Sequence, residues 1–111
     1  MSQPAPLDRT LAALADSHRR RTIELLGQGP RSSGDLARAL ELSPPAMSRH
    51  LRTLRECGLV EESHPAFDAR VRIYTLRPEP MVQLLRWLED AERLWSTQLA
   101  AFKAHVERDP Q

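Results

Sequence analysis

Ser48, Arg49 and Arg52 are the residues of this 111-residue chain whose types and spacing best suit binding chemistry. At 100° per residue they fall on one face of a helix, opposite an apolar stripe. A hydroxyl and two guanidinium groups can all donate hydrogen bonds to phosphate oxygens or to the edges of nucleic-acid bases. The opposite stripe consists of Met47, Leu51 and Leu54. The pattern predicts an amphipathic helix with a basic outward face.

Both ends of this helix carry recognisable signals. Ser43 is a good N-cap, and Pro44 suits the first helical position because an N–H there would be unpaired anyway. Gly58 can adopt the left-handed conformation that ends a helix, after which Leu59 can fold back on Leu54. The helix is therefore predicted from residue 44 to about residue 57.

A shorter helix is predicted just upstream, over residues 33–40. Its start carries Ser32 with Asp35 three residues later, a carboxylate variant of the capping box. Only residues 41–43 lie between the two helices, so the pair must turn sharply and pack at a large angle. The two segments predict a helix-turn-helix, whose second helix is the recognition helix.

Two extended segments follow, at residues 59–64 and 71–76. The second, VRIYTL, is rich in β-branched and aromatic residues and lacks Gly and Pro. Residues 65–70 show no helical pattern, so the two segments predict a β-hairpin, the wing of a winged helix. Arg70 and Arg72 lie at the base of its return strand. They either contact phosphate or the minor groove, or they are ordinary exposed arginines.

Two more helices are predicted before the helix-turn-helix, over residues 6–15 and 17–26. Asp16 can cap the second of them. Residues 19–21 are three arginines in its first turns, where positive charge opposes the helix dipole. Their benefit must come from elsewhere, either from a solvated or salt-bridged face or from contact with phosphate.

The last predicted helix is long, from residue 78 to residue 106. Its apolar residues recur at steps of three and four, close to a heptad seam. A compact core of this size cannot cover so long a stripe, so we expect a second copy of the chain to cover it in a homodimer. The predicted interface consists of Leu7 and Leu11 in the first helix and Leu84, Trp87, Leu88, Ala91, Trp95 and Leu99 in the last.

Length and charge limit the remaining possibilities. The length fits one domain over residues 6–106, with a disordered terminus at residues 1–5 and a flexible tail at residues 107–111. The net charge is only +1, but residues 17–77 carry 11 Lys/Arg against 7 Asp/Glu, as expected for a surface that meets phosphate. Neither a membrane span nor a signal peptide is visible, which favours a cytoplasmic protein without a membrane partner.

Three segments resemble the ArsR-type winged helix-turn-helix repressors at the usual spacing: LADSHRRRTIELL at 14–26, SGDLARALELSPPAMSRHLRTLRECGLVEE at 33–62 and RVRIYTL at 70–76. The tail after residue 78 is similar to the subset of that family that does not sense metals. The resemblance implies a mainly α fold with five helices and a small β-hairpin. It also implies a homodimer, joined through the first and last helices, that binds an imperfect palindrome and represses a nearby operon.

In a helix-turn-helix the N-terminal half of the recognition helix normally reaches base edges in the major groove. Arg49 is the best candidate for a guanine contact. The candidate DNA-binding residues are Ser43, Pro44, Pro45, Ser48, Arg49, His50, Arg52, Arg70 and Arg72.

The metal sites of the resembled family are not matched here. Members that sense thiophilic ions carry paired cysteines where this chain has Ser32 and Gly34. The site on the last helix needs Asp and His ligands, but His105 has no such partners and residue 108 is arginine. We therefore assign no metal and no cofactor.

Other reactive side chains are isolated in the sequence. Cys57 is the only cysteine, so a redox role competes with simple packing beside His50, which we favour. His50 itself is assigned to packing or to phosphate contact, and His18 and His64 have no neighbours of matching chemistry. No nucleophile elbow, phosphate loop or acid pair is present, so no catalytic residue is assigned.

Three hypotheses of function remain. We favour a homodimeric regulator that binds double-stranded operator DNA in a sequence-specific manner, with an unknown effector. The second is a regulator of the same fold that responds to a metal or an oxidant through atypical ligands. The third is a winged-helix domain that binds proteins, which the basic face at Ser48, Arg49 and Arg52 argues against.

Overall fold

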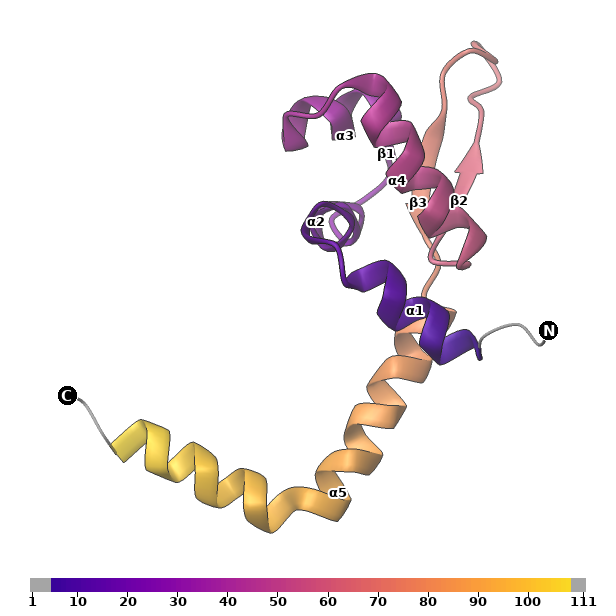
Figure 1. Cartoon of the computed structure of the whole chain (residues 1–111). Helices are drawn as coiled ribbons and strands as arrows, with labels where there is room; N and C mark the ends of the chain where they lie inside the picture. Colours follow the sequence, from indigo (N-terminus) through magenta and orange to yellow (C-terminus); the bar gives the residue numbers. More distant parts are fainter. Residues whose placement is uncertain (1–4, 109–111) are drawn as a thin grey trace.

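The computed structural model describes residues 5–108 and contains five helices and three short strands (Figure 1). All five predicted helices are confirmed, each within two residues of its predicted limits. In chain order the elements are α1 (Pro6–Leu14), α2 (Ser17–Leu26), β1 (Arg31–Ser32), α3 (Ser33–Leu40), α4 (Pro44–Glu56), β2 (Val60–Ser63), β3 (Ile73–Leu76) and α5 (Glu79–Arg108).

Three helices begin at the caps that the sequence predicts. The Asp16 carboxylate accepts hydrogen bonds from two backbone N–H groups at the start of α2, at 2.8 and 3.1 Å. The Ser32 and Ser43 hydroxyls each accept one backbone N–H in the first turn of α3 and α4, at 3.1 and 3.3 Å. Each cap satisfies an N–H that has no partner within its own helix.

Helix α4 ends in a Schellman motif, as predicted. Gly58 has a φ of 76°, and its N–H donates to the carbonyl of Arg55 at 3.0 Å. The N–H of Leu59 donates to the carbonyl of Leu54 at 3.0 Å, and both leucine side chains are fully buried. These are the paired bonds and the apolar contact of this motif.

The predicted hairpin is confirmed, but it belongs to a three-stranded antiparallel sheet in the order β1-β3-β2. Val60 pairs with Leu76 and Ser63 with Ile73 across the hairpin. The third strand, β1, consists of two residues paired with the other edge of β3. We missed it because two residues carry no alternating pattern, and because the second of them also caps α3.

The core lies between α2, α3, α4 and the sheet. The apolar stripe predicted for α4 is buried, with Met47 and Leu51 each 1% exposed and Leu54 fully covered. The side chains around it are Ala13, Ile23, Leu26, Leu36, Ala37, Leu40, Leu59, Val60 and Tyr74. The buried stripe fixes α4 so that its opposite, basic face points to solvent.

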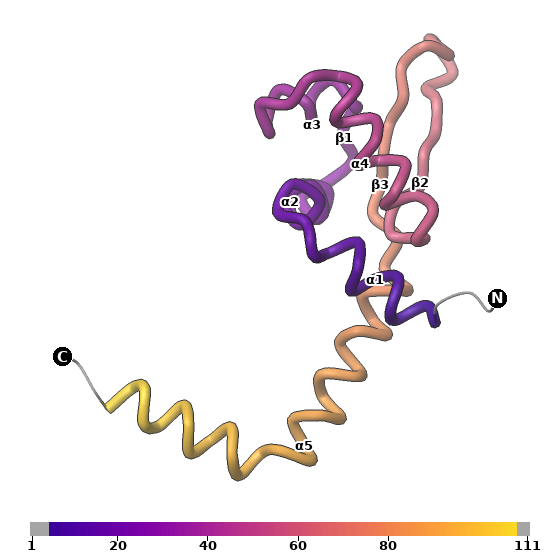
Figure 2. The backbone as a smooth tube through the Cα atoms, viewed as in Figure 1, coloured from indigo at the N-terminus to yellow at the C-terminus, as the bar shows by residue number. Residues whose placement is uncertain are grey.

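Helix α5 packs against α1 near its start and then leaves the body, changing direction about midway (Figures 1 and 2). No residue of α5 is buried in the single chain. It continues to Arg108, two residues past its predicted end. The predictions of disorder at residues 1–4 and of a flexible tail at residues 109–111 lie outside the described residues. Within residues 5–108 no helix is both long and apolar enough to cross a bilayer.

Candidate nucleic-acid interface

The outward face of α4 is exposed along its N-terminal half. Six candidate residues of the helix and its cap are all exposed: Ser43, Pro44, Pro45, Ser48, Arg49 and Arg52. They surround the first turns of α4, where two prolines leave no free backbone N–H at the first two helical positions. Polar contacts at this end must therefore come from side chains, chiefly from the hydroxyls and guanidinium groups.

The two arginines of this face differ from Arg38 and Arg55 nearby in forming no ion pair with any described residue. Within residues 5–108 neither Arg49 nor Arg52 forms an ion pair. By contrast, Arg38 on α3 pairs with Asp35, and Arg55 at the end of α4 pairs with Glu62. Arg49 and Arg52 therefore keep their full hydrogen-bonding capacity for an external anion or base edge.

The wing candidates, Arg70 and Arg72, are also exposed. The Arg70 side chain is 93% exposed, but its Nε lies 3.3 Å from the Asp68 carboxylate, which also accepts the backbone N–H of Arg70. Arg72 directly precedes β3 at the loop end of the hairpin, and its carbonyl accepts the N–H of Ser33 at 3.2 Å. Both arginines are exposed to solvent. The positive charge of Arg70 is partly compensated by the nearby Asp68 carboxylate.

The wing is attached to α4 through Glu62. Its carboxylate pairs with Arg55 and accepts the Tyr74 hydroxyl at 2.9 Å, and it lies 3.5 Å from Nε2 of His64. Burial raises the pKa of Tyr74 above its usual range, and the hydrogen bond and negative charge of Glu62 act in the same direction. Our view of His64 as isolated was wrong, because Glu62 and the Val71 carbonyl, 3.0 Å from Nδ1, both contact it.

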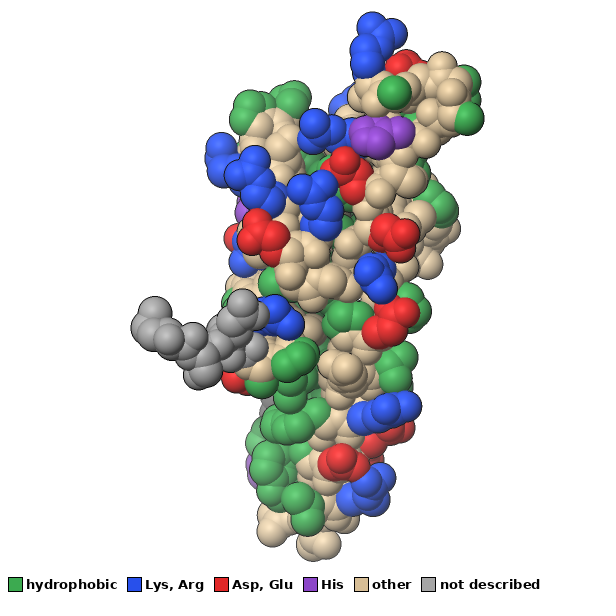
Figure 3. Space-filling view, turned by 90° about the vertical axis from the view of Figure 1, so that its right-hand side faces the viewer, with side chains coloured by type: hydrophobic (Ala, Val, Ile, Leu, Met, Phe, Trp, Pro, Cys, Tyr) green, Lys and Arg blue, Asp and Glu red, His purple; other side chains and the backbone are tan. Residues whose placement is uncertain are grey.

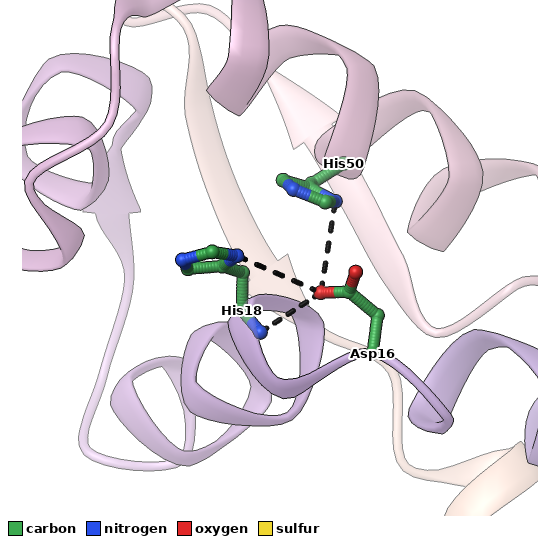
Figure 4. A group of neighbouring side chains, drawn as sticks. All are labelled: Asp16, His18 and His50. Atoms are coloured by element: carbon green, nitrogen blue, oxygen red, sulfur yellow. Dashed lines mark hydrogen bonds and ion pairs between the residues drawn. The ribbon is translucent and has the colours of Figure 1, made fainter.

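His50 is turned away from the exposed face toward α2 (Figure 4). Its ring is 19% exposed and lies 5.5 Å from the ring of His18, centre to centre. His50 Nδ1 is 4.0 Å from Asp16 Oδ1, and His18 Nδ1 is 3.9 Å from the same oxygen. His18 is therefore not isolated, contrary to our prediction; the contact joins residues 32 positions apart, which no local pattern reveals.

The ionisation states of this group follow from its surroundings. Desolvation opposes the charge of Asp16, but the backbone N–H groups of Arg19 and His18 and the nearby positive charges outweigh it and lower the pKa of this carboxyl. For His50, burial is the main cause of a lowered pKa. The charges of Arg19, His18 and Arg49 lower it further, against the opposing effect of Asp16.

Arginines at the start of α2 hold the end of α1. Arg19 Nε donates to the carbonyl of Ala13 at 2.7 Å, and Arg20 Nη1 donates to the carbonyl of Leu14 at 2.8 Å. The last carbonyls of a helix lack partners within it and carry its negative dipole end. Arg19 and Arg20 therefore stabilise the end of α1. This role is neither of the two that we predicted, a solvated or salt-bridged face and contact with phosphate.

Comparison with known proteins connects this geometry to a family. Residues 16–62, from the cap of α2 through most of β2, match the family described as bacterial regulatory protein, arsR family. The HTH-type transcriptional regulator Rv2034 of Mycobacterium tuberculosis is 37% identical over 102 residues, covering 92% of this chain and 90% of that protein. The arsenic resistance transcriptional regulator ArsR1 of Pseudomonas putida is 30% identical, over 86% of this chain and 75% of that protein.

The chain belongs to the ArsR family. Solved structures agree: an ArsR-like transcriptional regulator from Rhodococcus sp. RHA1 is 32% identical and superposes with a TM-score of 0.72, over 94% of this chain and 93% of that one. HlyU from Vibrio cholerae is 35% identical with a TM-score of 0.62, over 75% of this chain and 90% of that one. This ArsR-family protein is a DNA-binding transcriptional regulator, and its relatives are regulators rather than enzymes.

The positions that we compared with ArsR metal sites lie at the start of α3 and near the end of α5. The Ser32 hydroxyl caps α3, and a Cβ on Gly34 would contact the Arg38 side chain at 3.5 Å. His105 is exposed near the end of α5. Cys57, the C-cap of α4, is half-buried against the core, consistent with the packing role that we favoured.

Proposed function

We propose that this ArsR-family protein is a cytoplasmic, non-enzymatic repressor that binds an imperfect DNA palindrome as a homodimer. The observation that carries the proposal is the exposed face of α4, where Arg49 and Arg52 have no ion-pair partner within residues 5–108. A surface that keeps two free guanidinium groups beside Ser48 suits recognition of an anionic polymer with hydrogen-bonding edges.

The roles of the candidate residues divide by position. Ser43, Pro44, Pro45, Ser48 and Arg49 lie around the N-terminal half of α4, the part of a recognition helix that enters the major groove. Arg49 contacts guanine, because the guanidinium group matches the O6 and N7 acceptors of that base. Arg52, Arg70 and Arg72 neutralise phosphates, and the place of His50 behind the exposed face leaves it the role of positioning α4.

Self-association is inferred from the apolar side chains that the single chain leaves uncovered. Figure 3 shows hydrophobic side chains gathered along one side of the lower part of the molecule. On α5, Trp87 is 45%, Leu88 51% and Trp95 52% exposed. Leu11 of α1 is 45% exposed beside the start of this helix. Leu84, Ala91 and Leu7 are half-buried and Leu99 is 46% exposed, so the stripe has both a covered edge and an open one. A two-fold pairing through α1 and α5 would bury the open edge of the stripe on both copies of the chain.

Genomic footprinting with the purified protein tests the proposal and returns the operator and the neighbouring genes together. The expected footprint has two related half-sites with centres about one helical turn apart, roughly 34 Å. Affinity for this operator falls as salt is raised, because bound phosphates release counterions. Absence of any salt-dependent DNA binding would overturn the proposal and favour a winged-helix domain that binds proteins.

A further inference from the structure

Three side chains with metal-ligand chemistry meet where α2 faces α4. Asp16 and His18 come from the start of α2, and His50 comes from the middle of α4 (Figure 4). One ligand atom from each lies within 4.8 Å of the others, and Asp16 Oδ1 faces both imidazole rings. In the part of the chain that the structure describes, this is the one group of three His, Cys, Asp or Glu residues so arranged.

The spacing is close to what a small cation needs. Zinc binds imidazole nitrogen and carboxylate oxygen at about 2.0–2.2 Å, which places tetrahedral ligand atoms roughly 3.3–3.6 Å apart. The two separations between Asp16 and the histidines, 3.9 and 4.0 Å, exceed this range slightly, and the ligand atoms of the two histidines lie within 4.8 Å of each other. The His18 side chain is 43% exposed and the Asp16 side chain 33%, so both can adjust and solvent can reach the site.

Charge around the site both supports and opposes a cation. Asp16 supplies a carboxylate oxygen, and the two imidazole rings ligate a metal through a nitrogen in their neutral form. Arg19 Nη1 lies 3.4 Å from His50 Nδ1 and competes for that nitrogen. Its Nε donates to the Ala13 carbonyl at 2.7 Å, so Arg19 can keep this stronger contact when a metal displaces the longer one.

We propose that Asp16, His18 and His50 form a binding site for a divalent transition metal of the zinc type. Two nitrogens and one oxygen form a ligand set that zinc accepts, with the remaining position left to water. The site consists of residues at the start of α2 and in α4, and it includes none of Ser32, Gly34 and His105. A bound ion would join α4 to the start of α2 by ligand bonds, where the single chain has a 4.0 Å contact between His50 and Asp16.

Calorimetry with the full, tag-free protein, stripped with a chelator and titrated with zinc chloride, tests the site. The variants are His18→Gln, which removes a half-exposed ligand, and Asp16→Asn, which removes the charge but keeps a good N-cap. His105→Gln is the matched control, an exposed histidine near the end of α5. Wild type and the control should bind one zinc ion per chain, and each site variant should lose more than about tenfold in affinity.

Two further readings make the result decisive. Cobalt chloride should give visible ligand-field absorption in wild type that is lost in His18→Gln. Zinc should raise the Tm of wild type and of His105→Gln, but not that of the two site variants. Absence of zinc binding to wild type, or full affinity in His18→Gln, would overturn the proposal. Neither reading involves DNA, so the outcome is independent of the operator proposal.

Discussion

Helices α4 and α5 have apolar stripes of similar spacing, but the single chain buries the stripe of α4 and leaves that of α5 largely exposed. In α4 the stripe is covered by the same chain, and Leu54 is fully buried. In α5 no residue is buried, and Trp95 is 52% exposed. A stripe therefore indicates which face must be covered, but only the length and placement of the helix indicate whether its own chain covers it. We propose that α4 forms the DNA-reading surface and that α5 binds a second copy of the chain.

The largest effect is expected from a change inside the covered stripe. Leu54→Ala should lower the free energy of unfolding by about 2–5 kcal/mol, because it opens a cavity among fully packed side chains. Chemical denaturation measures this loss. Leu54→Met, which keeps the volume, should cost less than about 1.5 kcal/mol. A loss below about 1.5 kcal/mol for Leu54→Ala as well would mean that the core tolerates a cavity at this position.

The exposed stripe should respond through association. Burying an aromatic side chain is worth on the order of 2–3 kcal/mol, and each interface residue occurs twice in a symmetric dimer. Trp95→Ala should therefore shift the protein toward monomer in sedimentation and weaken operator binding without touching DNA. Ser96→Ala, at the exposed neighbouring position, should change neither. A Trp95→Ala protein that remains dimeric would move the contact to the side of Leu84, Leu94 and Leu99.

The turn that ends α4 should show a smaller, purely conformational effect. Gly58 has a φ of 76°, and a Cβ there would meet nothing within 4 Å, so Gly58→Ala should cost about 1–2 kcal/mol from backbone strain alone. Gly34 lies inside α3 without a positive φ. Gly34→Ala should leave the stability unchanged or raise it slightly. Thermal unfolding of the two variants measures both effects. Equal losses at the two glycines would contradict the assigned turn.

The smallest effects are expected in the wing. Arg70→Ala and Arg72→Ala should each weaken binding to all DNA sequences alike and reduce the salt slope by about one unit. Arg70 should show the weaker effect, because Asp68 already compensates part of its charge. Binding isotherms at several salt concentrations measure both slopes. Unchanged slopes would leave the two arginines as solvated residues and the wing as a structural element.

Local patterns predicted the helices, their caps and the hairpin, because each depends on residues a few positions apart. Ser43 and Gly58, for example, both act where the sequence places them. Contacts between distant segments were missed: the pairing of β1 with β3, the Glu62 cluster and the approach of His18 to His50. Each of these depends on how helices and strands cross, which residue spacing does not encode.

The central proposal is that α4, and not α5, reads DNA bases. It is tested most directly by measuring the affinity of Arg49→Ala for the operator and for random DNA at the same salt concentration. We predict a loss of about 1–3 kcal/mol on the operator, relaxed preference at one base position and little change on random DNA. Lys103→Ala, which removes one exposed positive charge from the far part of α5, is the control and should change neither affinity. Equal losses on operator and random DNA would contradict base recognition by Arg49 and assign it to phosphate.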